Sequence, residues 1–405
     1  MHNIPVYSTI QNARLEYVLH FVFTEVLKCG WHYVENKSRA AIVFGEKEES
    51  KCSFQASIMI EEGRFPKKAT FKDGKLYFNS ESFFDPFSAI FYCLSRMEEL
   101  NAPLDVHDRF SGDTSVFFGQ WETPWVDVWI EDLKHQLGID YKHEYNFLLT
   151  VDLDFGYRFL GKGFVRGTLA FVRDAITLRW KLAKQRLTSV VSNNDPFDGV
   201  YSWLTNRFQS SNLQFFALMA PFGQFDKGLN PNSSAWKRLK KQLSGYPVGL
   251  HPSYEHCDKK KRLAEGLVKL QSHGFDVVAN RFHFLRFRVE KDYRRLLDLG
   301  ITNDYSMGFA NRIGFRAQTS HTFYFYDLKK EEHTRLKIHP FVCMDAVYCN
   351  YMSLTSKEMQ QKVVEISDKV SALGGTVCLL WHEHTLVEGT ETRMLLEEIL
   401  REIKA

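Results

Sequence analysis

The stretch that decides the class of fold is residues 147–154, Phe-Leu-Leu-Thr-Val-Asp-Leu-Asp. A short apolar run that ends in carboxylates is typical of a buried parallel strand with polar groups at its carboxyl end. Comparable apolar runs follow at 248–250, 276–280, 300–302 and 377–381, and helical patterns separate them. The alternation of such runs with helices predicts an α/β fold.

Each of these runs leads into side chains that can bind a metal or move a proton. They are Asp152 and Asp154, His251, Arg281 and His283, Asp304, and His382. Parallel sheets and barrels collect their chemistry at the carboxyl ends of the strands. The sequence therefore predicts one shared site and indicates that the protein is an enzyme.

Length and composition indicate an ordinary globular protein. A chain of 405 residues is long for one domain and comfortable for two. The apolar share of 44%, the charged share of 25% and the net charge of +3 give no sign of nucleic-acid binding. The seven cysteines form no Cys-x-x-Cys pair, so neither a disulfide framework nor a zinc ribbon is expected. The first residues lack the pattern of a signal peptide, and no apolar stretch is long enough to span a bilayer. We therefore expect a cytoplasmic location, with membrane association left open.

Residues 1–140 are predicted to form a small α+β domain of unknown role. Residues 71–78 contain an Asp-Gly pair between two strand-like runs, which predicts a tight hairpin. Thr123-Pro124 precedes a helical pattern at 125–137, as a cap and a first-turn proline would. No compact catalytic motif is visible in this part of the sequence.

Residues 141–405 carry the strand–helix alternation. About seven strand candidates predict a distorted, partly closed (β/α) barrel. Thr355 and Glu358 have the spacing of a capping box, and they open a helix that Gly374-Gly375 ends.

An insertion at about 158–195 interrupts this alternation. Between Arg158 and Arg186 the chain has eight basic residues and one acidic residue, Asp174, interleaved with apolar ones. One interpretation is a basic amphipathic segment that makes peripheral contact with an anionic membrane through residues 158–186. The other is a helical hairpin that packs on the barrel with a solvated basic face. Because the segment directly follows Asp154, we expect it beside the mouth of the site.

Two carboxylates follow the first barrel strand. In an extended chain, residues two apart point to the same side, so Asp152 and Asp154 can serve one site. One can bind a cation while the other remains free as a base. The alternative is a turn or a helix cap built from aspartates.

Two histidines follow the apolar run at 248–250. His251 stands at the strand end, where it is well placed as a metal ligand, or it is a structural imidazole. His256 lies five positions on, which is outside a shared helical face. It reaches the same metal only from an irregular loop, and otherwise it is a surface histidine.

Residues 281–288 alternate polar and apolar side chains as a strand would, which places Arg281 and His283 on one face. An arginine beside a carboxylate lowers its pKa and fixes its orientation. Asp304 is a candidate partner for such an arginine or for a histidine. Arg316 is a candidate for binding an anionic or carbonyl group.

The last strand run ends in His382-Glu383-His384, where alternation places the two histidines on one side. One of them can act as a general acid near neutral pH, and His382 is the better candidate because it is nearer the strand.

These residues, in this order, resemble the polysaccharide deacetylase superfamily, the NodB-homology carbohydrate esterases. Residues 150–154, Thr-Val-Asp-Leu-Asp, look like the family's first motif. His251 looks like the first histidine of its second motif, Arg281 like the arginine of its third, and residues 379–382 like its final Leu-x-x-His motif. Residues 249–254, 281–286, 304–308 and 107–110 are typical of a bacterial subgroup with an uncharacterised N-terminal domain.

The resemblance implies a distorted (β/α) barrel, a divalent metal, commonly Zn²⁺, and hydrolysis of a sugar N-acetyl group. It implies that Asp154 and His251 bind the metal, that Asp152 is the base and that His382 protonates the leaving amine. Arg281 would orient Asp152. The family's second histidine sits four residues after the first, where this chain has Glu255. The third ligand is therefore His256, His283 or Glu255.

The sequence thus predicts a metal-dependent deacetylase that acts on a bacterial surface-polysaccharide precursor. The expected partner is a glycan, or a lipid-linked or nucleotide-linked sugar, and not a nucleic acid. Two alternatives remain. A glycosyltransferase-like enzyme can use Asp-x-Asp to hold a metal–nucleotide diphosphate, with no role for Arg281 and His382 at one site. A non-catalytic member of the family would bind glycan without metal, and its strand-end residues would not converge.

Overall fold

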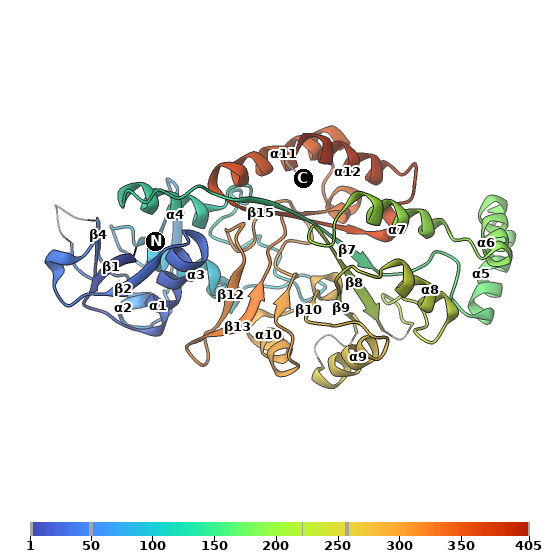
Figure 1. Ribbon diagram of the computed structural model, residues 1–405, viewed down its shortest axis with the longest axis horizontal. Coiled ribbons are helices and arrows are strands. Elements are labelled where there is room, and N and C mark those ends of the chain that lie inside the picture. Colours follow the sequence, from blue (N-terminus) through green and yellow to red (C-terminus); the bar gives the residue numbers. More distant parts are fainter. Residues whose placement is uncertain (1–2, 48–51, 221, 256–258, 404–405) are drawn as a thin grey trace.

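The computed structural model describes residues 3–47, 52–220, 222–255 and 259–403 (Figure 1). The molecule is elongated. The N-terminal region lies at one end, a large curled sheet occupies the middle, and two helices stand at the other end (Figure 1). None of the helices within these ranges is long and apolar enough to cross a membrane.

The N-terminal region has a parallel sheet in the order β2-β1-β3-β4. Its strands are β1 (Asn3–Ser8), β2 (Gly30–Tyr33), β3 (Ile42–Phe44) and β4 (Cys52–Phe54). The predicted hairpin is confirmed as the antiparallel pair β5 (Ala69–Lys72) and β6 (Lys75–Phe78). Asp73 and Gly74 both have positive φ, at 52° and 74°, as a two-residue turn of this kind requires.

Four helices pack around these strands: α1 (Ala13–Leu19), α2 (Ile58–Glu61), α3 (Pro86–Leu94) and α4 (Trp125–Gln136). A π-helical stretch, His20–Val26, continues α1, and one 3₁₀ turn, Met97–Glu99, follows α3. All nine residues of α3 are buried, which makes it the centre of this region's core. The predicted first-turn proline of α4 is displaced by one position, because Pro124 is its N-cap residue.

Ion pairs join the N-terminal region to the curled sheet, and in each of them the arginine is buried. Arg316 places Nη2 2.6 Å from Oε2 of Glu99, and Arg14 places Nη2 2.7 Å from Oε1 of Glu331. The anionic and carbonyl groups predicted for Arg316 lie within the chain, since its guanidinium binds the Glu99 carboxylate and, at 3.3 Å, the Gly308 carbonyl. The two parts of the chain meet through charged groups that a separated N-terminal region would leave unpaired.

The curled sheet has nine strands in the order β12-β13-β11-β10-β9-β8-β7-β15-β14. All neighbours are parallel except β12 and β13. The bounds are β7 (Tyr145–Leu153), β8 (Leu213–Met219), β9 (Val248–Pro252), β10 (Ala279–Asn280), β11 (Asn303–Asp304), β12 (Phe323–Asp327), β13 (Glu332–Ile338), β14 (Cys343–Met344) and β15 (Gly375–His382). This is the predicted distorted and partly closed (β/α) barrel, with β12 and β14 at its open edges.

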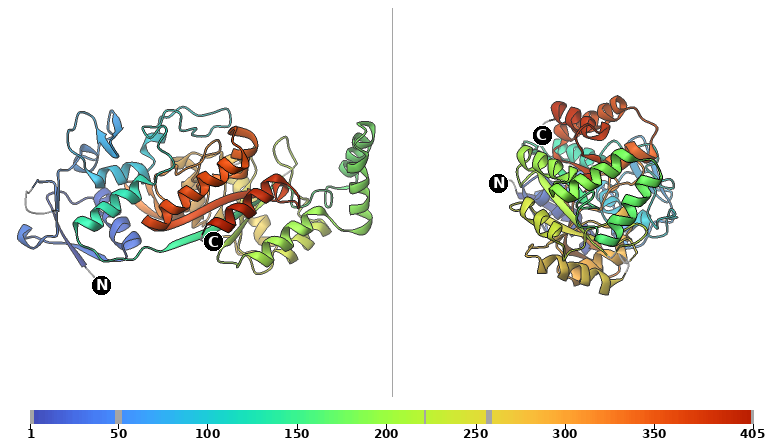
Figure 2. Two further views of the ribbon diagram at one scale, coloured as in Figure 1. Left: turned by 90° about the horizontal axis from the view of Figure 1, so that it is seen from above. Right: turned by 90° about the vertical axis from the view of Figure 1, so that its right-hand side faces the viewer.

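Helices cover the outside of the sheet, with α11 and α12 on one side and α9 and α10 on the other (Figures 1 and 2). They are α7 (Pro196–Arg207), α8 (Ser234–Gln242), α9 (Lys260–Ser272), α10 (Val289–Asp298), α11 (Ser356–Leu373) and α12 (Glu391–Glu402). The capping box of α11 is confirmed, because Thr355 accepts from the Glu358 amide and Glu358 accepts from the Thr355 amide.

The predicted insertion forms a helical hairpin of α5 (Phe164–Ile176) and α6 (Trp180–Ser192). It stands at the end of the molecule opposite the N-terminal region (Figure 1). It contributes no residue to the lining of the pocket described below, although the segment that leads into it comes near: Nζ of Lys162 donates to the Phe155 carbonyl at 2.8 Å, and the Phe155 ring packs on His384.

The predicted strand at 281–288 is wrong. Strand β10 ends at Asn280, and His283–Leu285 form a single 3₁₀ turn. Phe284 and Leu285 have positive φ, at 59° and 55°, so the chain reverses where an alternating pattern would have continued straight. The reversal comes after His283. Phe282 is extended, with φ −70° and ψ 128°, so Arg281 and His283 still lie on one side of the chain and reach the same region.

Candidate metal centre

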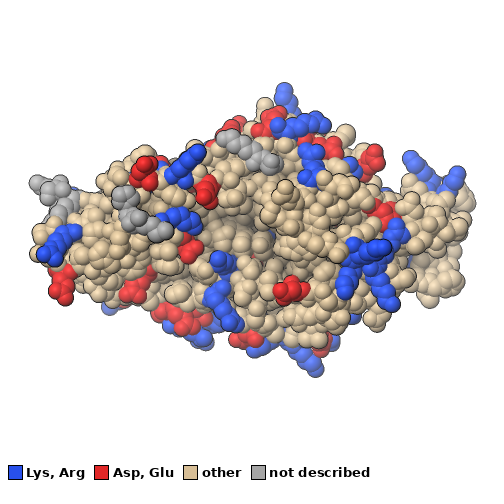
Figure 3. All heavy atoms as spheres, in the orientation of Figure 1, with Lys and Arg blue, Asp and Glu red and all other residues tan. Residues whose placement is uncertain are grey.

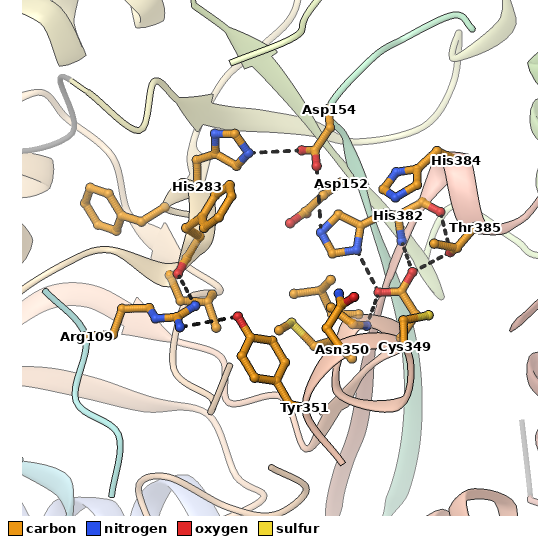
Figure 4. A pocket seen from close by; sticks show the side chains of 17 residues that line it. Arg109, Asp152, Asp154, His283, Cys349, Asn350, Tyr351, His382, His384 and Thr385 are labelled. Carbon is orange, nitrogen blue, oxygen red and sulfur yellow. Dashed lines mark hydrogen bonds and ion pairs between the residues drawn. The ribbon is translucent and has the colours of Figure 1, made fainter. Parts of the chain in front are cut away.

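A pocket of about 440 Å³ opens at the carboxyl ends of the central strands (Figure 4). Register places its polar groups there, since Asp152 of β7 pairs with His382 of β15, and His251 lies on β9 beside β8. The lining also includes groups from both parts of the chain, among them Arg109, Asp154, His283, Asp345, Asn350 and Tyr351. The pocket therefore forms where the N-terminal region meets the open end of the barrel.

Three side chains in and beside this pocket form a group that could hold a metal ion: Asp154, His251 and His283. Nε2 of His251 lies 3.4 Å from Oδ1 of Asp154, and Nε2 of His283 lies 3.6 Å from the same oxygen. Ligands bonded to tetrahedral zinc at roughly 2.0–2.1 Å are separated by about 3.3 Å. The spacing of these atoms thus fits a small divalent cation.

Two of these ligand atoms are buried and have no hydrogen-bond partner among the described residues. They are Oδ1 of Asp154 and Nε2 of His251. A buried polar atom without a partner is costly, so natural proteins rarely leave one without a reason. A cation between the two atoms would satisfy both, which is the observation that best supports metal binding here.

The other ring nitrogen of each histidine is occupied. Nδ1 of His251 lies 2.6 Å from the Arg281 carbonyl, and Nδ1 of His283 lies 2.9 Å from Oδ1 of Asp226. Because a carbonyl and a carboxylate only accept, each Nδ1 carries a proton, and Nε2 is the nitrogen left to bind a metal. Contacts of this kind orient metal-ligating histidines in proteins.

Asp226 is a buried carboxylate that sequence patterns did not single out. It accepts from Oγ of Ser253 at 2.6 Å and from the Tyr254 amide at 3.0 Å, besides His283. Burial disfavours the charge on His283, but Asp154 and Asp226 together raise its pKa to about 9. A proton therefore competes with a cation for Nε2 of His283, and metal binding displaces that proton.

An arginine binds one carboxylate oxygen of Asp152. Nη1 of Arg281 lies 3.2 Å from Oδ1 of Asp152 and 2.8 Å from Oγ1 of Thr150. The guanidinium is fully buried, and its Nε donates to the Tyr305 carbonyl at 2.9 Å. The other carboxylate oxygen, Oδ2 of Asp152, faces Nε2 of His251 at 3.7 Å. One oxygen of Asp152 is thus fixed while the second points at the metal group.

A histidine–carboxylate pair lies on the opposite wall of the pocket (Figure 4). Nδ1 of His382 lies 2.7 Å from Oδ1 of Asp345, a buried residue directly after β14. The His382 amide also donates to Oδ2 of Asp345 at 2.9 Å. Burial disfavours the charged imidazole, but Asp345, followed by Asp154 and Asp152, outweighs this effect and raises the pKa of His382 to about 10. Nε2 of His382 is left facing Oδ2 of Asp154 at 3.9 Å.

Glu383 fixes the loop that carries Asp154. Its buried carboxylate accepts from the backbone amides of Asp154, Phe155 and Gly156, at 3.1, 2.5 and 2.9 Å. Burial, followed by the charge of Asp154, raises the pKa of Glu383 to about 8. Glu383, which lies between His382 and His384, thus positions the loop that carries the candidate ligand Asp154.

The structure brings together Asp152, Asp154, His251, Arg281, His283 and His382. It does not bring Asp304 among them. The buried Asp304 accepts from Nδ2 of Asn280 and from Oγ of Ser306, both at 2.9 Å. The prediction that Asp304 partners an arginine or a histidine is therefore wrong, and its contacts tie the ends of β10 and β11 together. His256, the other candidate ligand, lies outside the described residues.

The fold and the pocket define an α/β barrel with a candidate metal centre at the carboxyl ends of its strands. Residues 4–141 match a family of unknown function, DUF7033. A search of curated proteins finds no match to the chain.

Two solved structures show a distant likeness in fold. One is the "putative polysaccharide deacetylase from Mycobacterium smegmatis", at 13% identity and a TM-score of 0.41, over 64% of this chain and 84% of that one. The other is a 4-alpha-glucanotransferase from Thermococcus litoralis, at 11% identity and a TM-score of 0.37, over 64% of this chain and 37% of that one. At these values neither likeness identifies an activity for this chain.

Proposed function

We propose that this protein is a metal-dependent hydrolase that removes an N-acetyl group from a sugar of a bacterial surface-polysaccharide precursor. The observation that carries the proposal is that two neighbouring ligand atoms, on Asp154 and His251, have no hydrogen-bond partner. Beside them lies a second carboxylate, Asp152, which Arg281 binds. A bound divalent cation would polarise the amide carbonyl and lower the pKa of a water molecule. Zn²⁺ suits a site of two imidazoles and one carboxylate.

The side chains of the pocket supply the proton transfers of amide hydrolysis. Asp152, oriented by Arg281, accepts a proton from the water whose oxygen attacks the acetyl carbon. As the bond between that carbon and the sugar nitrogen breaks, His382 gives a proton to the nitrogen. The products are acetate and an amino sugar. Asp345 keeps His382 in the protonated state that a general acid needs.

The rest of the pocket suits a sugar. Arg109 and Tyr351 place a guanidinium and a phenol on one wall, with Nη2 of Arg109 3.4 Å from the Tyr351 hydroxyl, and the Asn350 amide lies beside them (Figure 4). Such donors and acceptors bind sugar hydroxyl groups. Arg109 belongs to the N-terminal region, which therefore takes part in substrate binding in this proposal.

The glycosyltransferase alternative gives Arg281 and His382 no role at one site, and the non-catalytic alternative has strand-end residues that do not converge. The contacts of Asp152 and Asp154 with Arg281, His251 and His382 favour hydrolysis over both.

The test combines metal analysis of the purified protein with an acetate-release assay. The substrates are a nucleotide-linked and a diphosphate-lipid-linked N-acetylglucosamine, each incubated with protein reconstituted with Zn²⁺. We expect about one metal ion per chain, and equal amounts of acetate and free amine from one of the two substrates. Release of nucleoside diphosphate without acetate would instead support the glycosyltransferase. Protein that takes up no metal would refute the hydrolase.

Replacing Asp345 by asparagine is expected to lower kcat by about 100-fold or more, the lower end of what a positioned general acid contributes. The amide keeps the shape of Asp345 but loses the charge that raises the pKa of His382. Since a raised pKa preserves the protonated imidazole as pH rises, the alkaline limb of the kcat profile should move to lower pH. Metal content should stay unchanged, because Asp345 contacts none of the three candidate ligands. An unshifted alkaline limb would contradict the role given to His382.

A further inference from the structure

The hairpin of α5 and α6 exposes apolar side chains to an unusual degree. The exposed fractions of Leu169 and Ile176 are 65% and 75%, and those of Leu178 and Trp180, in and beside the turn between the helices, are 74% and 62%. Asp174 is the single residue of α5 that is buried. Exposed apolar residues scattered singly are normal, but a contiguous set marks an interaction surface.

Four of the exposed apolar residues of α5 lie on one face. Val165, Leu169, Val172 and Ile176 follow each other at intervals of four, three and four residues. That spacing places them in a single stripe along the helix. The stripe leads at its C-terminal end to Leu178 and Trp180 in the turn region. We call these six residues the hairpin stripe.

The hairpin is nevertheless an ordered unit with its own internal contacts. Nη2 of Arg186 on α6 lies 2.8 Å from Oδ2 of the buried Asp174, and Nη2 of Arg173 lies 2.9 Å from its other oxygen. This charge cluster joins the two helices from within. Asp174 and Ala183 are buried in the hairpin, while the six residues of the hairpin stripe are exposed.

Cations accompany the hairpin stripe. Arg179, Lys181 and Lys184 are exposed, and no carboxylate of the described residues lies within ion-pair distance of them. They lie in the turn and the first turns of α6, next to Leu178 and Trp180. Lys and Arg also appear along the upper edge of the hairpin's end of the molecule, above a surface without acidic groups (Figure 3). Apolar side chains with adjacent cations are the features that bind an anionic lipid surface.

We propose that the hairpin stripe and these three cations dock the protein on an anionic membrane, with the apolar side chains at the level of the lipid headgroups. The hairpin that carries this surface stands at the end of the molecule, away from the N-terminal region (Figures 1 and 2), and the side chains of the hairpin stripe are exposed. The proposal goes beyond the proposed function and does not depend on it, since lipid binding needs none of the residues of the metal centre.

The test is flotation of the purified full chain with lipid vesicles. One set of vesicles is phosphatidylcholine, and in the other a third of the lipid is phosphatidylglycerol. Wild-type protein should float with the anionic vesicles at low salt, and binding should weaken with added salt because exposed charges are screened over about 10 Å at 0.1 M. Absence of binding to the anionic vesicles at low salt would overturn the proposal.

Two triple variants separate the two contributions. Leu169→Gln, Val172→Gln and Ile176→Gln together remove three of the four stripe residues of α5 and keep its helix propensity. We expect this variant to lose at least tenfold in partitioning. Arg179→Gln, Lys181→Gln and Lys184→Gln together should lose about 100-fold on anionic vesicles, since each cation near such a surface contributes about fivefold.

Matched controls lie outside the hairpin. Val106, whose side chain is 93% exposed, is replaced by glutamine, and Lys67, Lys68 and Lys72 are replaced by glutamine together. Both controls should bind vesicles as the wild type does. Equal losses in the controls and the hairpin variants would overturn the proposal, because binding would then reflect overall charge and hydrophobicity.

Fluorescence locates the contact. Vesicles that carry brominated acyl chains should quench the wild type, and Trp180→Phe should remove most of that quenching while the other tryptophans remain. A quenching signal unchanged in Trp180→Phe would contradict docking through the hairpin.

Sedimentation tests whether a second copy of the chain, and not a membrane, covers the hairpin stripe. A wild-type dimer that the α5 variant converts to a monomer, without vesicle binding, would overturn the membrane proposal.

Discussion

Replacing His251 by alanine is expected to lower the affinity for Zn²⁺ by more than the roughly 10- to 100-fold that loss of an outer contact to a metal ligand costs. The change removes Nε2, one of the two buried ligand atoms without a partner, and leaves Oδ1 of Asp154 with a single imidazole nearby. Acetate release should fall in proportion to metal content. The measurements are metal per chain after dialysis and Zn²⁺ titration against a chromophoric chelator.

A second substitution separates ligand loss from structural damage. His251→Asn retains a side-chain donor toward the Arg281 carbonyl and lacks Nε2, so it should fold as the wild type does and still lose the metal. His135→Ala, at an exposed position on α4, is the control and should keep both metal and activity. Full metal content in His251→Asn would show that other residues bind the cation.

Much of the barrel could be predicted because its signals are local. Residues 147–154 and 377–381 are apolar on both faces, which is the pattern of a strand covered on two sides, and β7 and β15 prove to be adjacent. The capping box at Thr355 and the Asp-Gly turn at 73–74 depend only on residues a few positions apart. Such elements form by short-range contacts, so a single sequence is enough to predict them.

The candidate metal group could be predicted only in part. Asp154 and His251 follow buried strands, and position alone indicated them. The third candidate ligand stayed open because Glu255 stands where the resembled family has its second histidine. His283 comes instead from the segment that follows a different strand, β10. Of the two candidates that the structure describes, His283 and Glu255, it brings His283 to Asp154 and His251, and His256 lies outside the described residues.

The carboxylates behind the histidines were harder to find. Asp226 lies in the long connection after β8, within no periodic pattern, and only its position after a barrel strand could have drawn notice. Asp345 follows β14, a strand of two residues, so its sequence signal was weak. Both act on a histidine distant in the sequence, and such pairings arise from tertiary packing that one sequence does not display.

Replacing Asp152 by asparagine is expected to reduce kcat by about 10²- to 10⁴-fold, the contribution of a positioned general base, while the metal remains bound. The amide oxygen can still accept from Nη1 of Arg281, so the side chain should keep its place. What is lost is the basic oxygen that faces His251 and takes the proton from water. The measurement is acetate release at saturating substrate, with metal content determined on the same sample.

The neighbouring carboxylate supplies the contrast. Asp154→Asn weakens a ligand whose Oδ1 lies 3.4 and 3.6 Å from the two imidazoles, so it should lose metal and activity together. Asp152→Asn should lose activity alone, and added Zn²⁺ should not restore it. If both variants lose metal equally, or if Zn²⁺ rescues Asp152→Asn, then Asp152 is itself a ligand and the base lies elsewhere. The separation of the two phenotypes follows from Arg281, because it binds one carboxylate and leaves the other to the histidines.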